Sequence, residues 1–589
     1  MEVLKTRNEI RKEDKWNIEA LFESDKKWEE EFSDLSEKIK EITIYSGNIT
    51  SENVCKVLKK RDELSLRMDR LFVYAGLRAN EDSSDSLHQS MDDRANMLLS
   101  DFSAVTSFIE PEILALGENE LKNIDFGIYS HYIEELLRSK EHILSADKEE
   151  ILSMAMPVTS SASNIFYMLN NADTVFPDAI DSKGEKHTLT HGNFTAFLQS
   201  EDRVLRKNAF ENVYATYGKN KNTLAAIYTG SIKADIFSSK VRKYPSCLDA
   251  ALFAYNIPTS VYTSLTEAVN KRLPLLHRYV ALRKKLLGVD ELHFYDIYVP
   301  LIKDVNISVK YDDAVKLVKE AVKPLGEDYC RIFNKGLDED GWVDKFENKG
   351  KRSGAYSWGS YGTHPYISMN FEGNIDSVFT LIHEMGHSMH SYYTWSNQPY
   401  IYGDYTIFVA EVASTVNEAL LTEYLLATAK DDATRKYIVN YFLEQFRGTI
   451  FRQTMFAEFE LEVHKRFEKG EALTYEDYCD IYLELNKKYY GENIVPDMQI
   501  ATEWARIPHF YTAFYVYQYA TGFSAAITLS RKILKENGAE NYINFLKGGS
   551  SKYSIELLKE AGADMTNPDT FNSALDVFEE LLSEAESWT

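Results

Sequence analysis

Apolar residues recur three and four positions apart through most of this chain, with charged residues between them. One clear stripe runs through Leu66, Met68, Leu71, Phe72 and Ala75. This spacing places apolar side chains on one face of an α-helix. The pattern therefore predicts a mainly α-helical protein, with long antiparallel helices joined by short polar turns.

The predicted helices form two groups. The first group covers residues 17–42, 50–78, 84–107, 111–115 and onward, 128–138 and 148–160, and the second covers 196–237, 258–287, 311–334, 407–426, 432–469, 474–490, 508–537 and 553–586. Between the groups, the turn residues Asp181 to Gly184 separate two short apolar runs, which predicts a hairpin within residues 172–191. We place a domain boundary there, between an N-terminal helical domain of residues 1–191 and a second domain of residues 192–589.

Residues 336–374 differ in composition from the predicted helices, because glycines interrupt a run of aromatic and polar residues. Residues 364–371 alternate as a strand does, and they lead toward a strongly apolar helix. Such a strand offers an edge to which an extended peptide can add through main-chain hydrogen bonds. The loop from Gly354 to Gly362 is either a flap over that edge or an irregular surface hairpin.

Composition restricts the class of partner. The formal net charge of −25 argues against nucleic acid, whose binding depends on Lys and Arg contacts to phosphates. The first residues lack the apolar segment of a signal peptide, and no apolar run reaches the length of a membrane span. The 4 cysteines are far apart in sequence, which suits a reducing compartment. We therefore expect a cytoplasmic protein without a membrane partner.

The strongest chemical signal lies in residues 375–393, which contain His383-Glu384-Met385-Gly386-His387. On a helix, positions four apart share a face, so His383 and His387 can bind one Zn²⁺. Asp376 or Ser377 is expected to cap this helix. Glu384 would lie beside the open position of the metal as the general base for a zinc-activated water.

A catalytic zinc needs a third protein ligand. The pattern with a third histidine fails, because the required glycine and histidine positions hold His390 and Tyr393. Glu411, an isolated acid in the apolar helix that follows, is the better candidate. Glu418 either accepts a hydrogen bond from a ligand histidine or is a surface acid. His390 is expected to support the ligands or to belong to the core.

Hydrolysis of a peptide bond also needs donors for the developing oxyanion. His509 precedes several tyrosines at spacings of one helical turn, which makes residues 506–522 the candidate segment.

Together these motifs resemble the M3 metallopeptidases, and more closely the oligoendopeptidase F branch of the family. The resemblance covers nearly the whole chain and includes residues 15–17, 21–22, 296–301, 350–357, the HExxH helix, the Glu411 helix and residues 509–522. It implies an ellipsoid of many helices whose two halves enclose a deep channel, with a small β-sheet next to the zinc helix. Residues 192–589 would then be the catalytic domain.

The resemblance also implies a zinc endopeptidase that cleaves internal bonds of short, unstructured oligopeptides, with one Zn²⁺ per chain. The implied zinc ligands are His383, His387 and Glu411, and the implied base is Glu384. His509 with Tyr517, Tyr515 or Tyr511 would stabilise the oxyanion, and the spacing in this chain leaves the choice of tyrosine open. The residues expected to contact substrate are Gly354, Tyr356, Tyr361, His364 and Tyr511.

Two alternatives remain at this stage. One is an inactive peptide-binding scaffold, which would need no stoichiometric zinc. The other is a carboxypeptidase that releases dipeptides, for which the sequence offers no clear arginine to bind a free carboxylate. The sequence is compatible with a monomer or a weak homo-oligomer.

Overall fold

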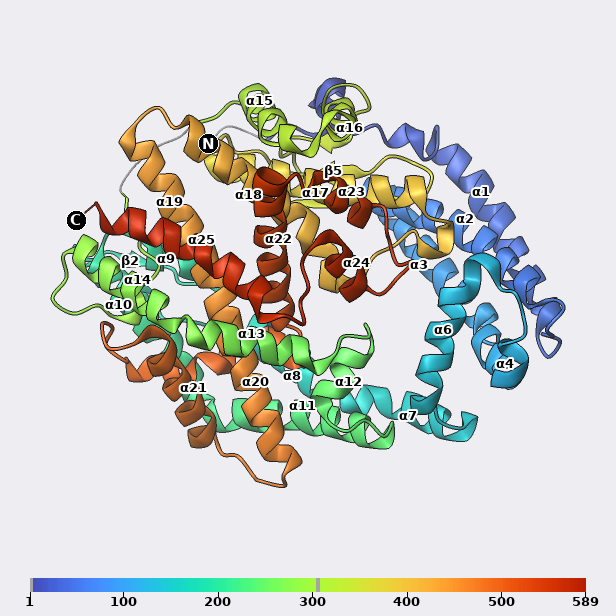
Figure 1. The fold of residues 1–589 in the computed structure, drawn as a ribbon, viewed down its shortest axis with the longest axis horizontal. Coiled ribbons are helices and arrows are strands. Elements are labelled where there is room, and N and C mark those ends of the chain that lie inside the picture. Colours follow the sequence, from blue (N-terminus) through green and yellow to red (C-terminus); the bar gives the residue numbers. More distant parts are fainter. Residues whose placement is uncertain (1–3, 303–307, 589) are drawn as a thin grey trace. The chain divides into compact units, whose positions relative to one another are not determined.

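The computed structural model describes residues 4–302 and 308–588. Helices make up most of these residues, which confirms the mainly α-helical class (Figure 1). The chain forms two compact units, each built from three segments. The first unit comprises Met1–Glu141, Asn306–Tyr424 and Leu529–Ala563, and the second comprises His142–Val305, Leu425–Thr528 and Asp564–Thr589.

The first unit contains the helices that begin the chain and those around the HExxH motif. Its helices are α1 (Asp25–Lys38), α2 (Val54–Glu81), α3 (Ser86–Thr106), α4 (Ile109–Ala115), α5 (Glu118–Leu121), α6 (Ser130–Ser139), α15 (Tyr311–Ala321), α16 (Glu327–Asp338), α17 (Ile375–Asn397), most of α18 (Ile407–Thr428), α23 (Ala539–Leu546) and α24 (Ser554–Ala561). Helices α1, α2 and α3 pack side by side (Figure 1). Met68, Leu71 and Ala75 of α2 are buried in their core, as the apolar stripe predicts.

The small sheet of this unit has the strand order β3-β5-β4, formed by β3 (Val343–Asp344), β5 (Tyr366–Ser368) and β4 (Tyr356–Trp358). Strand β3 is parallel to β5, and β4 is antiparallel to it. Both β4 and β5 pack against α17, which confirms the predicted sheet next to the HExxH helix. On its other side β4 approaches α2 closely, since a Cβ at Gly76 would lie 2.7 Å from the ring of Trp358.

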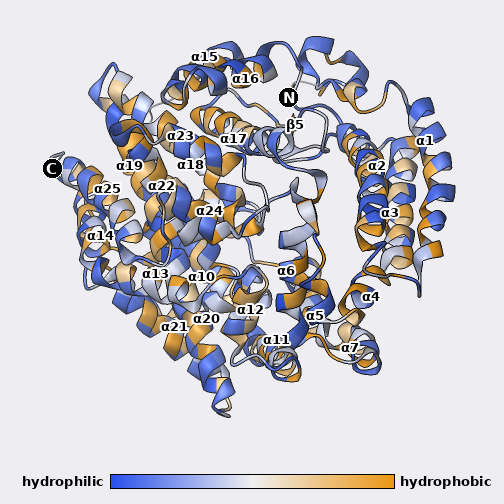
Figure 2. Cartoon of the chain, turned by 45° about the vertical axis from the view of Figure 1, so that its right-hand side comes forward, coloured by the Kyte–Doolittle hydropathy of each residue, from blue (hydrophilic) through white to orange (hydrophobic). Residues whose placement is uncertain are grey.

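The second unit is also helical. Its elements are α7 (Ala146–Thr159), α8 (Ser161–Met168), β1 (Ala179–Ile180), β2 (Lys186–His187), α9 (Phe194–Gln199), α10 (Arg203–Lys219), α11 (Lys221–Val241), α12 (Cys247–Phe253), α13 (Thr259–Lys271), α14 (Leu273–Leu287), α19 (Asp432–Phe446), α20 (Arg452–Glu468), α21 (Tyr475–Tyr490), most of α22 (Tyr517–Glu536) and α25 (Pro568–Glu586). Strands β1 and β2 pair antiparallel and form the predicted hairpin. Hydrophobic and hydrophilic residues alternate along most of these helices (Figure 2).

Several predicted helices are interrupted in the structure. The range 196–237 covers parts of three helices, because Ser200 leaves the helical region after α9, Asp202 caps α10, and Asn220, with a φ of −102° and a ψ of 17°, separates α10 from α11. The range 508–537 is a short 3₁₀ turn (Pro508–Tyr511) followed by α22, and Phe514 between them has a φ of 55°, outside the right-handed helical region. The periodicity of the apolar residues continues across these breaks, so the pattern alone predicted a longer helix.

The two compact units do not follow the predicted boundary between residues 191 and 192, because the second unit begins at His142 and both units return to distant parts of the chain. That boundary and the enclosed channel stay predictions. In the part of the chain that the structure describes, none of the helices combines the length and apolar character that a membrane span requires.

Candidate active site

The helix that carries the HExxH motif is α17. Asn374 caps it, since the Asn374 side chain accepts a hydrogen bond of 2.8 Å from the main-chain N–H of Ser377. The expectation of a cap at Asp376 or Ser377 was therefore wrong. Both residues lie inside the first turn, where Ser377 is the donor to the cap.

The structure brings the three predicted ligands together. Nε2 of His383 lies 3.2 Å from Nε2 of His387, and Oε2 of Glu411 lies 3.3 Å from the first nitrogen and 3.5 Å from the second. Donors about 2.0–2.2 Å from a tetrahedral Zn²⁺ are separated from each other by roughly 3.3–3.6 Å. The donor atoms, two imidazole nitrogens and one carboxylate oxygen, therefore match a zinc ion in both chemistry and spacing.

A close approach of two helices positions Glu411. A Cβ at Gly386 of α17 would lie 2.6 Å from Cα of Ser414 and 2.7 Å from the carbonyl oxygen of Ala413, both in α18. Only glycine permits this contact without a shift of the backbone. The side-chain amide of Asn417 in α18 also donates to the carbonyl of Ile382 over 3.3 Å. Together these contacts bring Glu411 to the two histidines.

Glu418 interacts with the other nitrogen of His383, since its Oε1 contacts Nδ1 of the imidazole. A proton on Nδ1 leaves Nε2 free to bind a metal, so this contact favours the tautomer and ring orientation that a ligand needs. Burial lowers the pKa of His383, but the neighbouring Glu411 and Glu418 raise it, with the net result of a pKa of about 10. Burial raises the pKa of Glu411, and its hydrogen bonds with His383 and His387 lower it well below the usual range.

Glu384 is buried, with 6% of its surface exposed, although it carries a carboxylate. Burial raises its pKa, and the neighbouring imidazoles of His383 and His387 lower it. A carboxyl group whose pKa is moved upward is better matched to a general base that works near neutral pH.

His390 lies in the core beside this centre. Its ring stacks on Tyr405 with a centroid distance of 3.8 Å, and burial lowers the pKa of His390 to about 3. The hydroxyl of Tyr405 lies 3.1 Å from Oγ of Ser391, and burial raises the pKa of Tyr405 to about 12, with the nearby Glu411 and Glu384 adding to this effect. Tyr405 was missed from the sequence, because the turn that follows α17 folds it back onto the helix and no residue pattern marks that contact.

Four of the residues expected to contact substrate belong to the first unit, and each has a different environment. Gly354 has a φ of 83° and open space around its Cα. The hydroxyl of Tyr356 accepts a hydrogen bond of 2.9 Å from the amide of Asn80, which binds this side chain to α2. Tyr361 donates to the carbonyl of Gln398 over 2.7 Å and lines a cavity. His364 stacks on Trp342, and burial lowers its pKa.

The oxyanion candidates belong to the second unit. His509 is exposed, and its Nε2 lies 3.2 Å from the hydroxyl of Tyr519. The Tyr515 ring is stacked at 6.0 Å from His509. Tyr517, in contrast, is 2% exposed and packs against Tyr262. Tyr519 lies within the candidate segment of residues 506–522, one helical turn after Tyr515, but the sequence did not distinguish it from the other tyrosines.

Tyr511, the remaining residue expected to contact substrate, also belongs to the second unit. Its ring stacks on Phe166 with a centroid distance of 4.2 Å, and it is partly buried. This contact leaves part of the ring exposed.

Sequence comparisons identify the family of the chain. The profile described as "Peptidase family M3" matches residues 196–577, and the profile described as "Oligopeptidase F" matches residues 112–176. The chain is 49% identical to Oligopeptidase PepF of Bacillus subtilis over 99% of this chain and 88% of the relative. It is 42% identical to Group B oligopeptidase PepB of Streptococcus agalactiae, over 99% of this chain and 98% of that protein.

A solved structure is similar as well. The crystal structure of oligoendopeptidase-F from Enterococcus faecium superposes with a TM-score of 0.73 at 38% identity, covering 96% of this chain and 99% of that chain. A helical fold with an HExxH helix and a converging glutamate defines the class of metallopeptidases. Within that class, the chain belongs to peptidase family M3. It is accordingly a metalloendopeptidase, a hydrolase of peptide bonds.

Proposed function

We propose that this enzyme is a zinc-dependent oligoendopeptidase, which hydrolyses internal bonds of short, unstructured peptides with Glu384 as its general base. The observation that carries the proposal is the separation of 3.2, 3.3 and 3.5 Å among the donor atoms of His383, His387 and Glu411. These separations suit a zinc ion bound by three protein ligands, with a fourth position left for water or substrate.

Each side chain then has a defined task. His383, His387 and Glu411 would hold the ion, and Glu418 would keep His383 in the correct tautomer. When bound, Zn²⁺ supplies Lewis acidity that lowers the pKa of water and polarises a carbonyl group. Glu384 accepts the proton of the attacking water and passes it to the leaving amine. Its burial keeps the proton away from bulk solvent during this transfer.

The substrate class is supported by the names of the relatives, which are oligopeptidases. Strand β4 favours a substrate in an extended conformation. It lies at the edge of its sheet and pairs there with β5 alone. Main-chain hydrogen bonds along such an edge bind peptides of many sequences. The assignment of His509, Tyr515 and Tyr517 to the oxyanion stays a prediction from the sequence.

The decisive test is the substitution Glu384→Gln, which keeps the shape of the side chain and removes its basicity. We expect this variant to retain one zinc per chain by elemental analysis and to lose most of the peptidase rate. Glu327→Gln, at an exposed acid of α16, is the matched control and should behave as the wild type. Unchanged turnover in Glu384→Gln would refute the assigned base.

Two further measurements define the reaction. Removal of the metal by a chelator should abolish cleavage, and added Zn²⁺ should restore it. Mass spectrometry of the products of a peptide of about ten residues separates an endopeptidase from an enzyme that releases dipeptides from the carboxyl end. Internal cleavage of a peptide whose carboxyl terminus is amidated would exclude the dipeptide-releasing alternative.

A further inference from the structure

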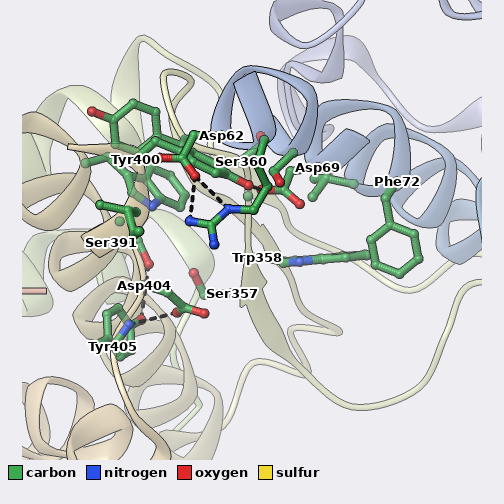
Figure 3. Close-up of a pocket in the computed structure, with 18 residues that line it drawn as sticks. Asp62, Asp69, Phe72, Ser357, Trp358, Ser360, Ser391, Tyr400, Asp404 and Tyr405 are labelled. Carbon is green, nitrogen blue, oxygen red and sulfur yellow. Dashed lines mark hydrogen bonds and ion pairs between the residues drawn. The ribbon is translucent and has the colours of Figure 1, made fainter. Parts of the chain in front are cut away.

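A cavity of about 650 Å³ lies within the first unit, between α2, strand β4 with the loop that follows it, and the end of α17 (Figure 3). The cavity and the two candidate histidine ligands share helix α17, which fixes the position of the cavity relative to them. Ser391, which lines the cavity, comes four residues after His387 in α17 and therefore lies one turn further along the same face. The cavity thus adjoins the metal centre.

Strand β4, the proposed binding edge for a peptide, also forms part of the wall of this cavity. Ser357 and Trp358 of β4 line the cavity, and Oγ of Ser357 lies 2.8 Å from Oγ of Ser388 in α17. Because β4 is an edge of its sheet, a peptide that adds to it passes the cavity.

The charges that line the cavity are unbalanced. Asp62, Asp69 and Asp404 line it together with a single basic residue, Arg61. The Arg61 guanidinium is already engaged, since it lies 2.9 Å from Oδ1 of Asp62 and donates to the hydroxyl of Tyr132 over 2.9 Å. The remaining carboxylates, Asp69 and Asp404, have no Lys or Arg partner among the described residues.

The environment of Asp69 shows this excess of negative charge directly. Its carboxylate accepts a hydrogen bond from the hydroxyl of Tyr400, and burial together with the neighbouring carboxylate of Asp404 raises the pKa of Asp69. A carboxylate whose pKa is raised by burial and by a neighbouring carboxylate is stabilised as the charged form when a cation lies beside it.

An independent feature points to a ligand. Ser360 lines the cavity and is 3% exposed, yet its hydroxyl has no hydrogen-bond partner among the described residues (Figure 3). Buried polar groups are nearly always paired in folded proteins, so a polar group of a ligand in the cavity would supply the partner that this hydroxyl lacks. A serine oxygen accepts hydrogen bonds from ammonium and guanidinium groups.

We propose that this cavity binds a positively charged group of the substrate peptide, with Asp69, Asp404 and Ser360 as its hydrogen-bond acceptors. The group is either a Lys or Arg side chain or the N-terminal ammonium, which present the same chemistry. The rings of Trp358, Trp395 and Tyr361 also line the cavity and would cover the apolar stem of such a side chain. The inference rests on the proposed oligopeptidase function and adds a preference for basic peptides to it.

The test uses internally quenched peptides of nine residues in which one Lys or one Gln is moved through every position. Each peptide is prepared with a free and with an acetylated N-terminus. We expect kcat/KM for the Lys peptide to exceed that for its Gln partner by roughly tenfold at one position, as for other hydrogen bonds to charged groups. A requirement for the free N-terminus instead would identify the ammonium as the ligand.

The same ratio is then measured in Asp404→Asn and Asp69→Asn. Both substitutions should bring the ratio close to one, while Asp101→Asn, at an exposed acid of α3 outside the cavity, should leave it unchanged. Asp404 is exposed, so its substitution is not expected to disturb folding. The proposal is overturned if the wild type shows a ratio near one and cleaves the free and acetylated peptides equally, or if its preference survives both substitutions. Continued cleavage would still support the peptidase function.

Failure of the peptidase function is recognised separately. If no peptide is cleaved, the proposed function fails, and the cavity is tested through the affinity of the same peptides for Glu384→Gln by fluorescence anisotropy. Equal affinities for the Lys and Gln peptides, together with equal affinities for the free and acetylated forms, would overturn the proposal there as well.

Discussion

Gly386 of α17 packs directly on the main chain of Ser414 in α18, with 2.6 Å between the position of a Cβ and Cα of Ser414. Ser414 lies three residues after Glu411, and its hydroxyl donates to the Glu411 carboxylate over 3.1 Å. The glycine inside the HExxH motif therefore sets the distance between the helix of the two histidines and the helix of Glu411.

We expect Gly386→Ala to push α18 away and to weaken zinc binding. Excess volume in a packed core costs about 1–3 kcal/mol of unfolding free energy. Urea unfolding and elemental analysis measure both effects. Gly218→Ala on α10, where a Cβ meets no atom within 4 Å, is the matched control and should gain up to about 1 kcal/mol. Full zinc occupancy and unchanged stability in Gly386→Ala would show that the helices adapt without moving Glu411.

Replacement of Glu418 tests its proposed role as the hydrogen-bond partner that orients His383 for metal binding. Glu418→Gln can still accept a hydrogen bond from His383 but carries no charge, so the imidazole becomes a weaker ligand. We expect the affinity for zinc to fall by about 10–100-fold, measured by competition with a chromophoric chelator at constant pH. Glu327→Gln, at an exposed acid of α16, should bind zinc as the wild type does. An equal loss in both variants would rule out a specific role for Glu418.

Substitution of the tyrosines separates the candidates for the oxyanion. Tyr519→Phe removes the hydroxyl that contacts His509, and we expect kcat to fall by about 10²-fold or more if this group is a donor to the oxyanion. Tyr517→Phe changes a residue that is 2% exposed, and its effect on kcat should be much smaller. Steady-state kinetics on one peptide decide between them, and a larger loss in Tyr517→Phe would restore the expectation from the sequence.

The stability of the second unit should depend on the ionisation of Glu460. This carboxyl is fully buried and accepts a hydrogen bond of 3.1 Å from the main-chain N–H of Phe514, whose φ is 55°. Burial raises the pKa of Glu460 well above 4.5, and Asp235 adds to this effect. Because folding favours the protonated form, the stabilisation is complete below pH 4.5 and is lost as the pH rises toward the raised pKa.

We therefore expect Glu460→Gln to flatten the dependence of unfolding free energy on pH and to be more stable than the wild type under alkaline conditions. Glu462→Gln, an exposed position two residues further along α20, is the matched control. Urea unfolding between pH 5 and 9 measures the difference. Parallel curves for the wild type and Glu460→Gln would contradict a protonated Glu460.

Local patterns predicted much of this protein. The positions of the α17 histidines follow from the helical repeat, and the isolated Glu411 in an apolar helix followed from the cost of an unpaired buried charge. The same patterns failed at Asn374, because capping depends on where the backbone leaves the helical region. They also failed at Phe514, because a left-handed residue leaves the apolar period unchanged.

The sequence by itself predicted most of the helices, the candidate metal ligands and the family, since these depend on spacings of a few residues and on motifs in a fixed order. Only the tertiary structure decided which side chains share a cavity. Asp69 and Tyr400, which are hydrogen-bonded there, are 331 positions apart in the chain. Contacts over such separations arise from the packing of whole helices, so no local pattern of residues specifies them.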